Sequence, residues 1–521
     1  MEPFNNIETK KSELRVFLAE YVKNNPSTRD EQWLKIQYYN KLSLPHLEEQ
    51  DLKALFDEAI VIEEEVKHTI EEDQDEAKIR AEFRKNKKKG TYLLAQYITS
   101  KFDIITVGEK EREMFVYQDG IYFQAENQII FPEIQHILGE DVDRSAKSET
   151  FHKICDMTHK PRSIFQTAPL ELIPLANGVY NFQTKQLLSH SSEYKFKYKF
   201  PVSYDDNATC SKTIAFIEQV LNPDQVLTVQ EWLGYYFYRS YMFKKAIIFV
   251  GEGDTGKTTL LEVFTYLLGK ENISSISLQK MSGDKFSAAH LYEKHGNLVD
   301  ELSAKDISDT GAFKVATGGG TITGEYKFGN QFAFHNFSKF TFACNRIPDV
   351  TDFDDTAYFN RWIVIRFENT ITKKIPNFVE SLKTEEERSG LFLWAMEGLV
   401  RLLNEGHFTY ANDADETKME MLRSSSSAGE FISRFVRQSV GSEITKEDMY
   451  DAYAEFCTQN KLSVATKKAF GMKFITLKYV SEGLIYGHGG KRVEGWRNVA
   501  IEKTPEEVNA ELEAENTFEH A

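Results

Sequence analysis

The chain has 521 residues, with 63 Lys and Arg against 80 Asp and Glu, and so a formal net charge of −17. Its 41% hydrophobic and 27% charged residues are ordinary for a globular protein and exclude a mostly disordered chain, and its length predicts about three domains. The four cysteines lack metal-ligand spacing, so neither a disulfide scaffold nor a structural zinc site is expected. Apolar runs too short to span a bilayer and an N-terminus without signal-peptide features predict a cytoplasmic protein with no membrane partner.

Residues 1–90 are predicted to form a helical N-terminal region, because apolar residues between 14 and 21 recur at helical spacing. Residues 46–78 are strongly acidic, with 13 acidic and 3 basic residues. The basic run 84–90 is interpreted as a solvated linker, and a phosphate-contacting arm is the alternative.

Residues 91–210 are predicted to form an α+β domain. The segment 114–123 is typical of a hairpin around Asp119-Gly120, and residues 177–182 give a second turn-and-strand pattern. Residues 211–245 return to helical periodicity and lead into the next domain.

The strongest motif follows a predicted buried strand at 246–250 and precedes a predicted helix at 259–268 that ends at Gly269. It fits G-x-x-x-x-G-K-[ST], in which backbone N–H groups and a helix N-terminus surround phosphate groups. We therefore predict that this loop binds ATP and Mg²⁺, with Lys257 on the β and γ phosphates and Thr258 on the metal ion. The predicted binding residues are Gly251, Glu252, Gly253, Asp254, Thr255, Gly256, Lys257, Thr258 and Thr259.

Polar residues follow two further predicted strands. Asp300 and Glu301 end the strand at 297–299, where Asp300 is predicted to hold Mg²⁺ and Glu301 to act as a general base on the attacking water. Asn345 ends the strand at 340–344, where an amide can position that water and sense the γ-phosphate. The alternative readings are an ordinary exposed strand end for the acidic pair and a turn-forming residue for Asn345.

These motifs and their spacing resemble the superfamily 3 helicases, the compact AAA+-like motors of small viruses, phages and plasmids. The resemblance extends over about residues 150–500 to the phage/plasmid and poxvirus primase–helicase family, through the segments 175–180, 204–205 and 232–235. It implies an α/β fold in which an AAA+-like P-loop core with a helical end spans residues 246–422. The preceding helical and α+β regions would then form the N-terminal part.

The resemblance implies an ATP-dependent DNA helicase, a homo-hexamer with 3′–5′ polarity, for replication of a phage, plasmid or other mobile element in the host cytoplasm. A self-loading replication initiator and a separate primase or replication protein as partner are further expectations. A primase domain is not evident, because the acidic motif Asp141-Val142-Asp143 with His152 follows what looks like a helix end and is interpreted as a turn. The alternatives are a DNA-binding AAA+ switch or assembly factor that does not unwind, and the helicase half of a primase–helicase.

The same family carries a DNA-gripping hairpin and an arginine finger that acts across the subunit interface. The matching hairpin lies at 318–329, so Lys327 and Phe328 are the expected contacts to single-stranded DNA. Arg361, before the apolar strand 362–367, is the expected finger, with Arg346 and Arg366 as competitors. The alternative for Arg361 is a salt bridge with Asp352, Asp354 or Asp355.

Residues 428–500 are predicted to form a winged helix, with helices at 430–440, from 445, and at 466–479, followed by a hairpin. Residues 461–500 carry eight Lys and Arg against two Glu. The expected contacts to duplex DNA are Lys467, Lys468, Lys473, Lys491 and Arg492. The alternative is a protein-interaction winged helix, with Trp496 expected in its core in either case.

Two flanking segments complete the chain. The serine run 424–427 is predicted to be a flexible linker, and residues 501–521 form an acidic tail with seven Glu and one Lys. This tail and residues 46–78 together contribute −16 of the net charge of −17. The net charge therefore does not exclude DNA contact by a channel and a basic module.

Overall fold

The computed structural model describes residues 15, 18, 21–22, 29–42, 47–109, 111–283, 286–303, 307, 309–326, 331–350, 355–369, 371, 375–475, 477 and 479–502. The chain divides into two compact units, residues 1–118 with 122–164, and residues 119–121 with 165–521. Among the described residues, no helix is long and apolar enough to cross a membrane.

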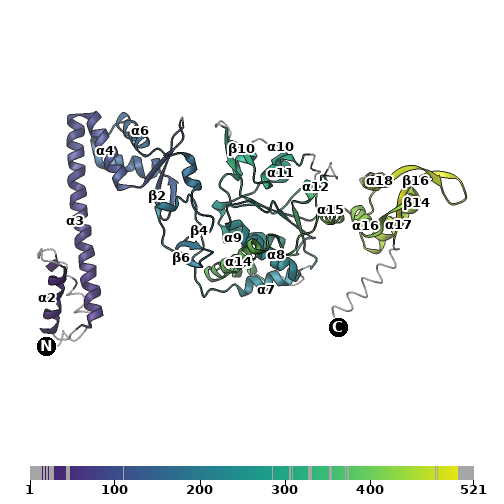
Figure 1. The fold of residues 1–521 in the computed structure, drawn as a ribbon, viewed down its shortest axis with the longest axis horizontal. Coiled ribbons are helices and arrows are strands. Elements are labelled where there is room, and N and C mark those ends of the chain that lie inside the picture. Colours follow the sequence, from purple (N-terminus) through teal and green to yellow (C-terminus); the bar gives the residue numbers. More distant parts are fainter. Residues whose placement is uncertain are drawn as a thin grey trace. The chain divides into compact units, whose positions relative to one another are not determined.

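The first unit is mainly helical, with one small antiparallel sheet (Figure 1). A 37-residue helix is followed at once by a second helix, and both contribute to a core with the strands and later helices of the unit. The elements are α2 (Arg29–Leu42), α3 (Glu49–Lys85), α4 (Lys87–Lys101), β1 (Ile104–Val107), β2 (Glu113–Gln118), β3 (Ile121–Gln124), α5 (Phe131–Leu138) and α6 (Arg144–Thr158).

The basic run 84–90, predicted to be a linker, is helical instead. Asn86 ends α3 and caps α4, because its side chain accepts a hydrogen bond from the Lys89 backbone N–H. Arg84 and Lys87 form ion pairs with Asp141 and Asp143, so these two charges have protein partners and are not simply solvated as the linker prediction assumed. The same pairs occupy both acids of the 141–143 motif, and Asp143 also caps α6.

The predicted domain at 91–210 is divided between the two units. Residues 165–210 belong to the second unit, where β4 (Leu172–Leu175), β5 (Gly178–Asn181) and β6 (Gln186–Leu188) form a small antiparallel sheet. Tyr180 and Phe200 are buried in the same core as α7 (Ser211–Val220) and α8 (Pro223–Phe237). This shared core explains why the segment belongs with the later part of the chain.

The centre of the second unit is a parallel sheet of five strands in the order β13-β7-β12-β9-β8. Alternate residues of β7 enter two different cores, Ile247 and Phe249 on one face and Ile248 and Val250 on the other. Helices α8, α9 and α14 contribute to the first core. Because a core covers each face of the sheet, every residue of β7 is buried, and its sequence is a continuous apolar run. The elements are β7 (Ala246–Val250), α9 (Lys257–Leu268), β8 (Ile273–Ser274), α10 (Leu278–Gly283), β9 (Gly296–Val299), β12 (Lys339–Cys344), β13 (Trp362–Arg366), α13 (Phe378–Leu382) and α14 (Glu385–Glu405).

An antiparallel hairpin stands between β9 and β12 along the chain. It consists of β10 (Thr321–Glu325) and β11 (Gln331–His335), and it follows α11 (Gly311–Thr317). The proposed DNA-contacting residues Lys327 and Phe328 lie outside the described residues. The short helix α12 (Thr356–Phe359) then leads into β13.

The C-terminal part packs three helices against a three-stranded antiparallel sheet of order β14-β16-β15. Half of the predicted helix 430–440 is a strand, because α16 ends at Phe435 and Val436 pairs with Ile501 of β16. Trp496 is buried, as predicted. The elements are α15 (Ala414–Arg423), α16 (Ser427–Phe435), β14 (Val436–Thr445), α17 (Lys446–Gln459), α18 (Lys467–Phe474), β15 (Ser481–Tyr486) and β16 (Arg492–Ile501).

The serine run 424–427 is a tight turn between α15 and α16 rather than a flexible linker. The Ser426 side chain caps α16, and the Ser427 hydroxyl lies 2.9 Å from the hydroxyl of Tyr453 and donates to the carbonyl oxygen of Ser463. Most of the predicted acidic tail, residues 503–521, lies outside the described part of the chain.

Candidate active site

The glycine-rich loop (residues 251–256) joins the central strand β7 to α9. Gly256 has φ +95°, and a Cβ there would lie 3.2 Å from the Phe216 ring. A Cβ on Gly251 would lie 2.4 Å from the carbonyl oxygen of Phe367. Glycine is therefore required at both ends of the loop, for conformation at Gly256 and for close packing at Gly251. The loop ends as α9 begins at Lys257, so the N-terminal N–H groups of this helix open onto the site.

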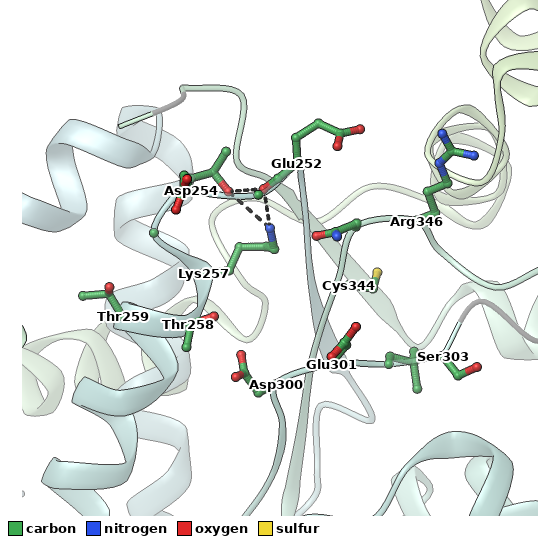
Figure 2. Close-up of a pocket in the computed structure, with 15 residues that line it drawn as sticks. Glu252, Asp254, Lys257, Thr258, Thr259, Asp300, Glu301, Ser303, Cys344 and Arg346 are labelled. Atoms are coloured by element: carbon green, nitrogen blue, oxygen red, sulfur yellow. Dashed lines mark hydrogen bonds between the residues drawn. The ribbon is translucent and has the colours of Figure 1, made fainter. Parts of the chain in front are cut away.

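The Lys257 ammonium is held inside this loop (Figure 2). Its Nζ donates to the carbonyl oxygens of Gly251 and Glu252, both at 2.7 Å, and to the Thr255 hydroxyl at 3.2 Å. Burial lowers the pKa of Lys257, and the charges of Glu252 and Asp300 oppose that shift. These carbonyl contacts hold the cation where an anionic ligand in the loop could replace them.

The parallel register brings three strand ends to one edge of the sheet. Cys344 of β12 pairs with Val250 of β7, and Phe342 of β12 pairs with Val299 of β9. The residues that follow these strands therefore meet in one pocket of about 790 Å³. Its polar lining includes the predicted residues Glu252, Asp254, Thr255, Lys257, Thr258, Thr259, Asp300, Glu301 and Asn345.

The pocket lies where the strand order of the sheet reverses. Strand β7 has β13 on one side and β12 on the other, although both follow it in the sequence. Ligands of open parallel sheets bind in the crevice that such a reversal leaves at the carboxyl ends of the strands. The topology thus makes this edge the expected ligand-binding edge, independently of the residue types there.

The side chains in this pocket fit a phosphate group and Mg²⁺. Figure 2 shows the Asp300 carboxylate and the Thr258 hydroxyl near each other in the pocket. Together these two groups supply oxygen ligands of the kind that Mg²⁺ prefers. Lys257 and the N-terminus of α9 supply positive charge and N–H donors for the phosphate oxygens. Glu301 and Asn345 line the same space and leave room for a water molecule between them and the loop.

Three residues of this pocket were missed from the sequence, Leu302, Ser303 and Cys344. Burial raises the pKa of the Cys344 thiol to about 12, so this side chain is a neutral wall of the site near Lys257. Cys344 is the last residue of the predicted strand 340–344 and directly precedes Asn345, which was identified. This position at the strand end was the signal from which Cys344 could have been predicted.

Arg361 lies away from the pocket, at the opposite end of the sheet. Its carbonyl oxygen accepts a hydrogen bond from the Ala246 N–H, which places it beside the first residue of β7 rather than the last. Its Nη1 donates to the carbonyl oxygen of Ala357, and its buried Nε has no hydrogen-bond partner among the described residues. Of the proposed acidic partners, Asp355 attracts Arg361 electrostatically but forms its own ion pair with Lys314.

The two competing arginines lie at the carboxyl end of the sheet. Arg346 lines the pocket directly after Asn345. Arg366 is paired with Glu368 and Glu420 and is not part of the pocket lining. Of the three candidate arginines, Arg346 is therefore the one that lines the pocket within the same chain.

The proposed DNA contacts of the C-terminal part differ in their surroundings. Lys473, predicted as a DNA contact, forms an ion pair with Asp349 and its side chain is 12% exposed, so a contact to DNA would have to compete with this carboxylate. Lys467 is exposed, pairs with Glu447 and lies 5.2 Å above the ring of Tyr450. Lys468, Lys491 and Arg492 are exposed.

Two families match parts of the chain. Residues 35–222 match the D5 N terminal like family, and residues 249–361 match a family of unknown function, DUF5906. The chain is also 25% identical over 218 residues to the putative helicase L207/L206 of Acanthamoeba polyphaga mimivirus. That match covers 39% of this chain and 22% of the relative, so the chain spans about a fifth of the relative's length.

Solved structures of the NrS-1 C terminal region are similar over most of the chain. The A form apo structure has a TM-score of 0.44 at 12% identity and covers 78% of this chain and 98% of that one. A second apo structure of the same region has a TM-score of 0.43 at 13% identity and covers 79% of this chain and 99% of that one.

Proposed function

We propose that this chain is an ATP-dependent DNA helicase of superfamily 3 that acts in the replication of a virus, phage or other mobile element. The observation that carries the proposal is the meeting of Lys257, Thr258, Asp300, Glu301 and Asn345 in one pocket at the reversal point of a parallel sheet. The similarity to a putative viral helicase supports it.

The residues of the pocket divide the work of ATP hydrolysis. The loop N–H groups and Lys257 would bind the phosphates, and Thr258 and Asp300 would hold Mg²⁺. When bound, Mg²⁺ neutralises charge on the phosphate oxygens. Glu301 takes a proton from the attacking water, whose oxygen bonds to the γ-phosphorus as the β–γ bridge breaks and ADP leaves. Asn345 orients that water through its amide.

A ring of subunits would complete this site, and we propose a homo-hexamer. Arg361 is at the amino end of β13, remote from the pocket of its own chain, and its Nε is unpartnered among the described residues. Such a position suits an arginine that neutralises the transferring phosphoryl group in a neighbouring subunit.

Contact with DNA is assigned to two regions. The hairpin β10–β11 would follow a single strand in the central channel with 3′–5′ polarity, and Lys327 and Phe328, which come between its two strands in the sequence, are the proposed contacts. The C-terminal part would contact duplex DNA as a winged helix through Lys467, Lys468, Lys491 and Arg492, and could thereby load the protein at an origin. A separate primase or replication protein is the proposed partner.

The proposal is tested by the ATPase rate with and without single-stranded DNA. Lys257→Ala should abolish nucleotide binding, whereas Glu301→Gln should retain binding and lose hydrolysis. Lys270→Ala, an exposed lysine just beyond α9, is the control and should hydrolyse ATP like the wild type. Lys327→Ala should retain basal hydrolysis and lose its stimulation by DNA. Equal ATPase rates for Lys257→Ala and the control would refute the site.

Wild-type ATPase activity without strand separation would favour the alternative, a DNA-binding switch or assembly factor. Nucleotide polymerisation associated with the protein would instead favour the helicase half of a primase–helicase.

A further inference from the structure

A second cavity adjoins the pocket. It has a volume of about 350 Å³ and shares Glu252, Thr255, Asn345 and Arg346 with the pocket as common walls. Its remaining walls come from the ends of β7 and β13, from the turn between α15 and α16, from α16 itself and from residues 462–463. We call it the arginine cavity, because its charged lining includes four arginines, Arg346, Arg366, Arg423 and Arg434, beside the three carboxylates of Glu252, Glu368 and Glu430.

Two of these arginines are already paired. Arg366 binds Glu368 and Glu420, and Arg434 binds Glu430 at 2.8 Å. Such pairs balance the charge of the walls and fix the two guanidinium groups in place.

Arg423 is not paired in this way. Its Nε is buried and has no hydrogen-bond partner among the described residues, and the buried hydroxyl of the next residue, Ser424, has none either. Burial lowers the pKa of Arg423, the charges of Arg366 and Arg434 lower it further, and the carboxylates of Glu420 and Glu430 oppose the shift. Buried donors without partners are costly, and here two belong to adjacent residues that both line the cavity, so a ligand in the cavity is a candidate source of the missing acceptors.

We propose that the arginine cavity is an anion site that binds orthophosphate through Arg423, Ser424 and Arg346. Orthophosphate offers several acceptor oxygens, which matches a fork of guanidinium donors and a hydroxyl. Since water takes about 30 Å³ in the liquid, the cavity has room for the ion and bridging waters. The shared wall at Asn345 and Arg346 makes it the next space open to the phosphate that the pocket would release, so this role rests on the proposed ATPase.

The binding step can be tested apart from hydrolysis. Isothermal titration of sodium phosphate into full-length Lys257→Ala protein should still show one site, because the arginine cavity does not use Lys257. Adding Arg423→Met should weaken that site by about tenfold or more, the loss expected for one charge-assisted contact. Adding Arg437→Met, an exposed arginine of β14 paired with Glu502, should change nothing.

Two further measurements keep the test decisive. Ser424→Ala removes only a hydroxyl and should also weaken phosphate binding, with the melting temperature without phosphate unchanged. A short DNA oligonucleotide should not displace the bound phosphate, and displacement would overturn orthophosphate as the ligand. The proposal also fails if Lys257→Ala alone abolishes phosphate binding, or if Arg423→Met leaves it unchanged. A protein that binds phosphate here but never hydrolyses ATP would refute the proposed function and leave the anion site standing.

Discussion

Replacing Asp355 by Asn should loosen the base of the hairpin and the Arg361 segment together. Asp355 caps α12, where its Oδ1 accepts the Tyr358 N–H at 3.0 Å. Its Oδ2 accepts from Lys314 Nζ at 2.6 Å and from the Thr310 hydroxyl at 2.7 Å, on either side of the start of α11. One carboxylate thus connects the helix that precedes the hairpin to the helix that precedes Arg361.

The expected cost follows from these contacts. The amide introduced by Asp355→Asn would keep an oxygen for the cap, so the lost part is the charge-assisted bond to Lys314. The side chain of Asp355 is 7% exposed and that of Lys314 is 32% exposed, so solvent screens the pair only in part. A hydrogen bond to a charged group contributes about 1.5–3 kcal/mol, and partial screening reduces the expectation to about 1–2 kcal/mol. Asp355→Ala should cost about 1 kcal/mol more through loss of the cap.

The pH dependence has a definite sign. Burial alone would raise the pKa of Asp355, but the hydrogen bonds from Lys314, Thr310 and the Tyr358 N–H outweigh it and lower the pKa. The stabilisation is therefore complete above the pKa that Asp355 has in the unfolded chain, about 3.9. It is lost as the pH falls through the lower pKa that Asp355 has in the folded chain. The Asp355→Asn variant should lack this acid-dependent loss.

Hydrogen–deuterium exchange is the suitable assay, because local opening free energies can be followed in a chain too large for two-state unfolding. In Asp355→Asn, peptides covering 311–317 and 356–366 should both lose protection from exchange, and their local opening free energies should fall by about 1–2 kcal/mol. Lys314→Met should have a similar effect, and the double variant should cost clearly less than the sum. Strict additivity, or a change confined to one of the two peptides, would refute the coupling.

Three other outcomes are expected. Gly256→Ala should weaken nucleotide binding and destabilise the loop by about 1–2 kcal/mol, because a Cβ is strained at positive φ; fluorescent-nucleotide titration measures the first. Arg401→Met should lower the local opening free energy of α8 and α14 by about 3 kcal/mol in hydrogen–deuterium exchange, because it leaves the carboxylate of Glu231, 1% exposed, without its cation. Arg492→Gln should reduce the slope of log K against log salt for duplex DNA by about 0.9, whereas Lys473→Gln should not; equal slopes for both variants would contradict the assignment.

The carboxyl-end residues of the sheet were predictable because each follows a short, continuous apolar strand. Parallel strands buried on both faces give this pattern, and their carboxyl ends meet at one edge whatever lies between them. Glu301 and Asn345 are 44 positions apart, yet both were identified from the strand that each one follows and meet in the pocket.

The errors concern contacts between distant residues. The run 84–90 was read as a linker because its charges were counted without Asp141 and Asp143, which lie over 50 positions away. Val436 begins a strand only because Ile501 is available to pair with it. The arginine cavity was invisible for the same reason, since Arg346 and Arg423 approach each other only in the folded chain.

The most direct test of the central claim is strand displacement from a forked DNA duplex in the presence of ATP and Mg²⁺. Wild-type protein should release the labelled strand from a fork with a 3′ loading tail, and Lys257→Ala should not release it. ATP hydrolysis by the wild type without displacement from a fork of either tail polarity would contradict the helicase assignment.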